Sequence, residues 1–505
     1  MHRLQQKVVG KVKLLGKAES VPTSAAKLAQ VVFVPKTNKT QALQQALPFP
    51  VSEHVLDDFN ANAKESIMLY PKDNARTLLV GLGDSVDEVS LRDATHEALA
   101  QLTSRGIQQA LLEAPSVDTV PAQRVAEVMA ETSVLSNYRF DRHLSPPKDE
   151  KEPVKQPLSD IFVRASAEFD QIVAEKLAVA EETILARNLG NERSDVVDPA
   201  FVEAVAKESA SLPNMRVSVL QEADLRAEGM HMMALVGQAA TCPPRLVVLE
   251  YTGAPSNASK RIALVGKGIT FDTGGLNLKP TGFIEDMHTD MCGSAAVLGA
   301  IRAASKMQLE CNIVAVLALA ENAIGSKAAK PHTIVKSLKG LSVEVNNTDA
   351  EGRLVLGDAL TYVQKHYAPH TVIDAATLTG ACMVALGEYC AGLFSNSDDL
   401  AASLQQSGQT THERCWRLPI LPEHTAELKG YQSDSRSTGK TRYGGACTAA
   451  AFLQQFIEKD VKWAHVDIAG PSNYSSAKSY MPQGATGFGV QLLYDFIKKT
   501  EHASK

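Results

Sequence analysis

Cysteine is scarce in this sequence, and its pattern argues against a disulfide framework. The seven cysteines are odd in number, spread from Cys242 to Cys447, and form no Cys-x-x-Cys pair. Small secreted domains held by disulfides typically carry an even set at close spacings, so reduced thiols inside a cell are the better interpretation. We therefore expect a cytoplasmic protein.

Long apolar runs are also missing. No stretch approaches the roughly 20 consecutive apolar residues that a membrane helix needs, so no membrane association is expected. The first 17 residues are basic but lack the apolar core of a secretory signal. A mitochondrial transit peptide stays open, because the first 18 residues contain no acidic side chain.

An excess of positive charge is absent as well. The formal net charge is −6, which leaves no general basic surface for nucleic acid, so a nucleic-acid partner is unexpected. Hydrophobic residues make up 44% and charged residues 21%, the balance of a globular protein with a large core. At 505 residues the chain is too long for one ordinary domain, and we expect two.

Residues 1–160 predict a small N-terminal α/β domain, because short apolar strands alternate with stretches of helical spacing. The strands are expected at 30–35, 77–83 and 109–113, and the helices at 89–105 and 122–136. A linker follows at 145–157, where four prolines and alternating charges favour an exposed, extended chain.

Residues 161–505 predict a larger C-terminal α/β domain around a mixed central sheet. It would begin with an Ala-rich linker helix at about 172–188. The apolar runs 312–320 and 371–376 are typical of central strands buried on both faces. Further strands are expected at 216–220, 245–250 and 261–266, and helices at 294–307 and 448–458.

The segment Val345–Asp358 carries the densest set of candidate functional residues. It contains Asp349, Glu351 and Arg353, each two residues from the next. In an extended segment these three side chains would point to the same side. Unpaired buried charge is costly, so such a pattern favours a cation site beside an anion site rather than a packed strand.

Two more charged clusters precede this segment. Lys267 and Asp272 are expected to follow a buried strand directly, in a glycine-rich stretch that continues to Lys279. Alone, that stretch is better explained by a glycine-rich turn with one lysine salt bridge than by a functional site. Asp290 lies just before a helix of small residues, where it would either cap the helix or bind metal.

Together the clusters supply four carboxylates, enough for two divalent ions with shared ligands. They are Asp272, Asp290, Asp349 and Glu351. No His-Glu-x-x-His motif and no Cys/His set with zinc spacing occurs, so any metal site is rich in carboxylates. Arg353 and Lys279 would stand where negative charge develops or an anion binds. The Gly-x-Ser-x-Gly elbow of serine hydrolases and the phosphate-loop motif are both absent.

The sequence resembles a known family. Asn347–Leu354, read Asn-Thr-Asp-Ala-Glu-Gly-Arg-Leu, is similar to the signature of the leucyl aminopeptidase family, the M17 metallopeptidases. Other blocks similar to the family stand in the family's order, among them 266–275, 290–293, 376–381 and 463–470. The resemblance covers about 180–500 strongly and the first 160 residues only in general character.

The resemblance implies a division of roles among the candidate residues. Two ions, zinc or manganese, would share Asp272 and Glu351, with Lys267 and Asp290 completing the tighter site and Asp349 the more exchangeable one. Arg353 would hold a bicarbonate ion that acts as general base, and backbone N–H groups around Gly352 and Leu378 would complete its cradle. Lys279 would stabilise the tetrahedral intermediate. The side-chain pocket positions would be Met287, Thr377 and Gly380.

The family also implies peptide substrates, release of N-terminal residues with a preference for Leu or other apolar residues, and a homo-hexamer. Two alternatives remain within the family. A DNA-binding accessory role is disfavoured by the acidic charge, and an inactive scaffold is disfavoured by the complete ligand set. A Cys-Gly dipeptidase activity cannot be separated from leucyl aminopeptidase activity on residues alone.

Overall fold

The computed structural model describes residues 10–17, 19–21, 28–37, 39–47, 49–71, 75–145, 156–257 and 260–502. Most of the predicted linker and the start of the basic N-terminus lie outside these ranges. The chain forms two compact units. The first comprises the described residues up to Glu181 together with Ser476–Pro482, and the second comprises Glu182–Ser475 and the described residues from Gln483 onward.

The first unit is built on a sheet of order β1-β6-β5-β2-β4-β3, counted over its described residues. Its strands are β1 (Lys11–Gly16), β2 (Leu28–Pro35), β3 (Ser66–Leu69), β4 (Thr77–Gly83), β5 (Gln109–Glu113) and β6 (Asp160–Ala165). Only β3, at one edge, runs antiparallel to its neighbour, and the other pairings in this sheet are parallel.

Helices cover both faces of this sheet. They are α1 (Lys39–Ala46), α2 (Glu53–Asp58), α3 (Glu88–Ser104) and α4 (Ala122–Ser136). Helices α3 and α4 share one apolar core with the sheet, and a second cluster on alternate strand residues includes side chains of α1. The small α/β fold and all five elements predicted here are confirmed, β4, β5 and α4 at their predicted bounds.

Two strands at the far side of this sheet went unpredicted. β1 is a six-residue strand with only one buried residue, and β6 begins where the sequence placed the end of the domain. β6 pairs with both β1 and β5, so it belongs to the first sheet. The sequence division at 160/161 would separate β6 from that sheet, whereas the compact units meet at Glu181/Glu182, within α5 (Asp170–Asn191).

The second unit contains a mixed sheet of order β15-β14-β17-β13-β9-β10-β8-β7 over its described residues. Its strands are β7 (Met215–Leu220), β8 (Arg245–Thr252), β9 (Arg261–Asp272), β10 (Asn312–Asn322), β13 (Thr371–Ala376), β14 (Ala391–Ser395), β15 (Cys415–Arg417) and β17 (Lys462–Asp467). Small sheets join β11 (Thr333–Lys336), β12 (Ser342–Val345) and β16 (Ser435–Arg436), and β18 (Asn473–Tyr474) and β19 (Gly484–Ala485).

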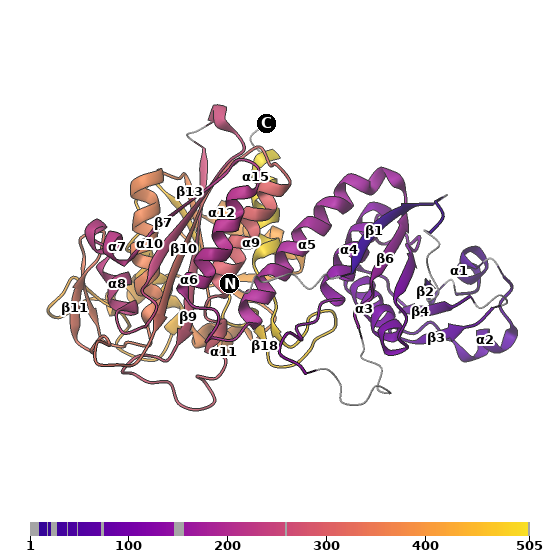
Figure 1. Ribbon diagram of the computed structural model, residues 1–505, viewed down its shortest axis with the longest axis horizontal. Coiled ribbons are helices and arrows are strands. Elements are labelled where there is room, and N and C mark those ends of the chain that lie inside the picture. The colour runs from indigo at the N-terminus through magenta and orange to yellow at the C-terminus, as the bar shows by residue number, and fades with distance from the viewer. Residues whose placement is uncertain are drawn as a thin grey trace. The chain divides into compact units, whose positions relative to one another are not determined.

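Helices also pack on both faces of the large sheet (Figure 1). One face shares an apolar core with α8 (His231–Gly237), α10 (Glu351–Tyr367) and α14 (Gly445–Gln454). α9 (Cys292–Lys306) packs on the central strands without joining that core, and α15 (Val490–His502) packs on α9. The remaining helices are α6 (Pro199–Lys207), α7 (Glu222–Glu228), α11 (Gly380–Leu386), α12 (Asp398–Thr411) and α13 (Pro422–Glu427). The predicted mixed α/β fold is confirmed.

The parallel strands β10, β9, β13 and β17 place their carboxyl ends at one edge of the sheet. The prediction that β9 ends at Gly266 was wrong. β10 keeps pairing with it through Lys267 as far as Asp272, so both residues lie within the strand. Open α/β sheets bind ligands at this edge, so a functional site is expected there.

The prediction of an extended segment at Val345–Asp358 was also wrong. The chain leaves β12 at Val345, turns, and enters α10 at Glu351. The apolar residues from Leu354 onward recur at helical spacing and are buried against the sheet, which explains the helix. Asp349 therefore lies in the turn, while Glu351 and Arg353 lie in the first turn of the helix.

Two further expectations concern membrane-spanning helices and disulfides. Among the described residues, no helix combines the length and the apolar character needed to cross a membrane. All seven cysteines lie in the described ranges, and none of them forms a disulfide there.

Candidate metal centre

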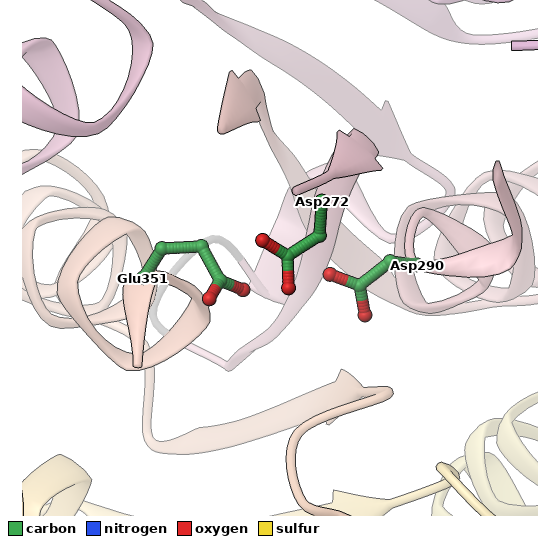
Figure 2. Close-up of side chains that lie close together, drawn as sticks. All are labelled: Asp272, Asp290 and Glu351. Carbon is green, nitrogen blue, oxygen red and sulfur yellow. The ribbon is translucent and has the colours of Figure 1, made fainter. Parts of the chain in front are cut away.

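Three carboxylates converge at the carboxyl edge of the large sheet (Figure 2). Asp272 ends β9, Asp290 follows a short 3₁₀ turn at Met287–Thr289, and Glu351 opens α10. Their ligand oxygens lie within 4.8 Å of one another, and all three residues are buried. Buried carboxylates at such separations repel one another, so the cluster needs positive charge.

Lys267 supplies part of that charge from within β9. Its Nζ lies 2.7 Å from Asp290 Oδ2 and 2.9 Å from Glu351 Oε1, and it donates to the backbone oxygen of Thr377 at 3.0 Å. Burial would lower the pKa of Lys267, but Asp290, Glu351 and Asp272 outweigh it and raise the pKa above its usual range. Without metal, Lys267 is therefore an ammonium group among the carboxylates.

Asp272 is held at both oxygens. Its Oδ1 accepts the Gly274 N–H at 2.9 Å and the Asn322 side-chain amide at 2.8 Å, and its Oδ2 lies 2.8 Å from Lys279 Nζ. Burial and the neighbouring Glu351 raise the pKa of Asp272 to about 6, against the lowering effect of the two lysines. The carboxylate thus has a fixed orientation and a high affinity for further positive charge.

Lys279 joins the cluster to Asp349. The Nζ of Lys279 lies 2.5 Å from Asp349 Oδ1, although Asp349 itself is partly exposed and outside the three-carboxylate cluster. The turn that carries Asp349 is closed by its own N–H, which donates to Asn347 Oδ1 at 2.9 Å. Burial would lower the pKa of Lys279, but Asp272 and Glu351 raise it on balance.

Asp290 does not cap α9, so that alternative was wrong. The residue before α9 is Met291, and no side chain caps this helix end. Asp290 instead accepts a hydrogen bond of 2.7 Å from the Thr377 hydroxyl, while its other oxygen faces Lys267. Burial raises the pKa of Asp290 well above its usual range, whereas the two lysines hold the pKa of Glu351 low against the effect of burial.

Gly352 leaves the room that Lys267 occupies. A Cβ at Gly352 would lie 2.5 Å from Lys267 Cε and 2.7 Å from its Nζ, closer than non-bonded atoms approach. The first turn of α10 can present Glu351 to Lys267 only because the next residue has no side chain. This requirement is local and steric, independent of any role for the Gly352 N–H.

Arg353 is a buried cation without a carboxylate partner among the described residues. Its Nη1 donates to the Ser437 backbone oxygen at 2.8 Å, and its buried Nε has no hydrogen-bond partner. Burial lowers the pKa of Arg353 to about 10, although Glu351, Asp467 and Asp349 oppose the shift. A buried, unpaired guanidinium favours binding of an anion.

Two of the other predicted residues, Thr377 and Met287, contact Asp290. Thr377 touches both Lys267 and Asp290, as described above, and the Met287 carbonyl accepts the Asp290 N–H at 3.3 Å. Gly380 is the exposed first residue of α11, with nothing near the position of a Cβ. The Leu378 N–H donates to Asp467 Oδ1 at 3.1 Å, so a bound anion would have to share it.

The donor set fits divalent cations. It offers several carboxylate oxygens, which hard and borderline cations prefer, and a lysine amine close to two of them. The four carboxylates face only two lysines, which leaves negative charge uncompensated. A divalent ion would relieve that repulsion and would also force the proton from Lys267, as a lysine ligand requires.

Sequence reasoning missed two residues that hold this site. Asn322 contacts Asp272, and the carboxylate of Asp467 accepts hydrogen bonds from the Leu378 N–H and from the Thr379 hydroxyl. Both are polar residues at the ends of buried strands that run parallel to the site-bearing strands. That placement was a usable signal, because such strand ends meet at one edge of the sheet.

The fold and this centre define a class: an α/β protein with a carboxylate-rich candidate metal centre at the carboxyl edge of its larger sheet. Comparison with known sequences specifies the family. A sequence model described as "Cytosol aminopeptidase family, catalytic domain" matches residues 184–494, and one for the family's N-terminal domain matches residues 31–147. The chain belongs to the cytosol aminopeptidase family, the M17 peptidases.

Several relatives are similar over most of their length. A probable cytosol aminopeptidase of Syntrophotalea carbinolica is 39% identical over 433 residues, which is 84% of this chain and 86% of the relative. That of Nitrosospira multiformis is 39% identical over 453 residues, or 87% and 86%. A solved structure of the bottromycin maturation enzyme BotP in complex with Mn superimposes with a TM-score of 0.84 at 31% identity, covering 94% of this chain and all of that one.

Proposed function

We propose that the protein is a dinuclear-metal leucyl aminopeptidase that releases N-terminal residues, preferably Leu or other apolar residues, from peptides. The observation that carries this proposal is the convergence of Asp272, Asp290 and Glu351 within 4.8 Å, with Lys267 among them. An acidic, buried donor set of this kind supports metal binding in a chain whose family consists of aminopeptidases.

The ligands divide into two groups. Asp272 and Glu351 would be shared, Lys267 and Asp290 would complete one site, and Asp349 would complete the other. Asp349 is the most exposed of the five, which supports its assignment to the more exchangeable site. The ions would be Zn²⁺ or Mn²⁺, and the Mn named for BotP supports manganese. When bound, two such ions supply a polarised carbonyl and an activated water.

Lys279 would act on the substrate rather than on metal. It reaches the cluster from a separate loop and faces Asp272 and Asp349 from the solvent side, being less buried than Lys267. A cation placed there can donate to an oxygen that becomes negative as the carbonyl carbon turns tetrahedral. Replacing Lys279 by Met should therefore lower kcat while the carboxylates keep their affinity for metal.

Arg353 would hold bicarbonate, which would accept the proton of the attacking water. The support is its buried guanidinium, which has one hydrogen bond and no carboxylate partner among the described residues. Activity in carbonate-free buffer should fall and recover on adding bicarbonate, and Arg353→Ala should remove that response. Activity indifferent to bicarbonate would refute this role.

Met287, Thr377 and Gly380 would line the pocket for the substrate side chain. Met287 and Thr377 both touch Asp290, and Gly380 leaves open space at the start of α11. An apolar pocket discriminates weakly, since one methylene is worth only about 1–3 kcal/mol. Comparing kcat/KM for Leu, Met, Ala and Cys-Gly substrates would test the preference for Leu.

The decisive experiment pairs one substitution with metal removal. Glu351→Ala should abolish hydrolysis of a leucyl amide while the thermal unfolding of the protein stays cooperative. Treatment with 1,10-phenanthroline should inhibit the unsubstituted enzyme, and Zn²⁺ or Mn²⁺ should restore it. A fully active Glu351→Ala variant, or an enzyme indifferent to chelation, would overturn the proposal.

We further propose a cytoplasmic homo-hexamer with no membrane or nucleic-acid partner. Cysteines that form no disulfide in the described residues support the location, and exposed apolar residues such as Val384, Tyr431 and Tyr443 support burial between subunits. Light scattering coupled to size-exclusion chromatography would test the assembly, and a monomer would contradict it.

A further inference from the structure

Asn322 is a buried amide at the point where β10 meets the metal centre. It is 5% exposed and ends β10, directly opposite Asp272 in the register of β9. The strands reach this pairing through a register shift between Ala320 and Asn322. None of the roles proposed above uses Asn322, yet it lies beside the carboxylate that both metals would share.

The side chain of Asn322 joins two segments of the centre. Its Nδ2 donates to Asp272 Oδ1 at 2.8 Å and to the Thr348 backbone oxygen at 3.0 Å. Both amide hydrogens are therefore committed, one to the end of β9 and one to the turn before α10. The two acceptors fix which way the amide points.

The backbone of Asn322 is held equally firmly. Its oxygen accepts the Thr273 N–H at 3.0 Å and the Thr273 hydroxyl at 2.7 Å. The side chain thus projects from a rigid strand end, and its reach to Asp272 and to Thr348 does not depend on a mobile loop. A rigid donor is what a positioning role requires.

The contact with Asp272 decides which of its oxygens is available. Two N–H donors occupy Oδ1, from Gly274 and from Asn322, so only Oδ2 faces the lysine side of the centre. The contact with Thr348 acts on the neighbouring residue, because Thr348 precedes Asp349. Asn322 therefore sets the position of Asp272 relative to Asp349.

We propose that Asn322 is a positioning residue that preorganises the metal ligands Asp272 and Asp349. The inference rests on the proposed dinuclear function. A neutral amide suits this position because it holds a carboxylate by hydrogen bonding without adding a competing positive charge. Groups that orient metal ligands in this way typically contribute about 10–100-fold in metal affinity.

A merely structural role is the competing explanation, and β10 supplies a matched control. Asn312 lies at the opposite end of the same strand and is also buried. Its Nδ2 donates to Ala254 and Asn257 backbone oxygens at 2.8 and 3.0 Å, far from the metal centre. Removing either amide leaves backbone oxygens without their hydrogen-bond donor, but only Asn322 contacts a proposed metal ligand.

The test compares Asn322→Leu with Asn312→Leu in the full-length protein. Leucine has a similar size and cannot donate. Mn²⁺ alone is titrated into metal-free protein against a fluorescent chelator, and kcat, KM and thermal unfolding are measured beside it. Asn322→Leu should weaken Mn²⁺ binding by about 10–100-fold and lower kcat at saturating Mn²⁺, whereas Asn312→Leu should lower the unfolding temperature and leave Mn²⁺ affinity within about twofold.

Asn322→Ala, which removes the amide without filling its space, provides the same measurement if the leucine variant does not fold. Mn²⁺ affinity of both Asn322 variants equal to that of the unsubstituted protein would overturn the inference while leaving the proposed function intact. An equal loss of affinity in Asn312→Leu would also overturn it, by assigning the effect to the strand as a whole. Failure of the unsubstituted protein to bind Mn²⁺ would instead remove the proposed function and the inference together.

Discussion

Replacing Gly352 by alanine should disable the enzyme while leaving its fold in place. The new Cβ would stand 2.5 Å from Lys267 Cε, 2.7 Å from Nζ and 2.8 Å from Cδ. Carbon atoms in contact need about 3.5–4.0 Å, so Lys267 would have to retreat by about 1 Å. It cannot do so freely, because Asp290, Glu351 and the Thr377 carbonyl all hold its Nζ.

Two effects on stability oppose each other. Gly352 is the second residue of α10, where alanine is favoured over glycine by up to about 1 kcal/mol. Overpacking a buried site costs about 1–3 kcal/mol. The free energy of unfolding should therefore fall by about 0–3 kcal/mol. Catalysis has no such compensation, and a misplacement of about 1 Å costs on the order of 100-fold in rate.

The assay is kcat/KM for a chromogenic leucyl amide with the Mn²⁺-loaded enzyme, read beside thermal unfolding. Gly325→Ala is the control, because its Cβ would meet Ala239 only at 3.9–4.0 Å. That variant should behave as the unsubstituted enzyme does. If Gly352→Ala kept its full kcat/KM, Lys267 would not be needed where the structure places it, and the steric argument would fail.

Three further substitutions test other parts of the structure. Thr377→Val removes the hydroxyl that donates to Asp290 and should weaken Mn²⁺ binding by about 10-fold in a chelator titration; unchanged affinity would contradict that contact. Thr379→Val leaves the buried Asp467 short of a donor and should lower the unfolding free energy by about 1–3 kcal/mol in urea titrations, and an unchanged midpoint would contradict this. Burial raises the pKa of Asp358 to about 7, above its unfolded value of about 3.9, so its stabilising contribution is full below pH 4 and is lost as pH rises to 7. Asp358→Asn, which stays neutral, should therefore cost less stability at pH 8 than at pH 5, and an equal cost at both would refute the shift.

Local pattern was enough to predict the fold class and several of the longer buried elements. β4, β5 and α4 appear at their predicted bounds because their apolar periods are complete within the segment itself. β1 was missed because it is short and has a single buried residue. β6 was missed although Ile161, Phe162 and Val163 are buried, because it follows directly on the proline-rich segment that the sequence placed at the end of the domain. The functional site could likewise be predicted only in part. Signature residues could be singled out one by one, but Asn322 and Asp467 act through contacts across strands, and their placement at the ends of buried strands was the one sequence signal for them.

The register shift in β9 explains why alternation could not locate the centre. Lys267 and Asp272 are five residues apart in one strand, so a regular strand would direct them to opposite faces. The pairing runs from Ala320 opposite Ile269 to Asn322 opposite Asp272, which gives β9 one residue more than β10. One extra residue reverses the alternation beyond it, and both side chains then reach the same cluster. Asn322 is the first residue of β10 paired after that reversal, and its amide binds the aspartate that the bulge has turned. The bulge and the Asn322 amide therefore act together. The bulge brings Asp272 to the same side of β9 as Lys267, and the amide holds Asp272 there.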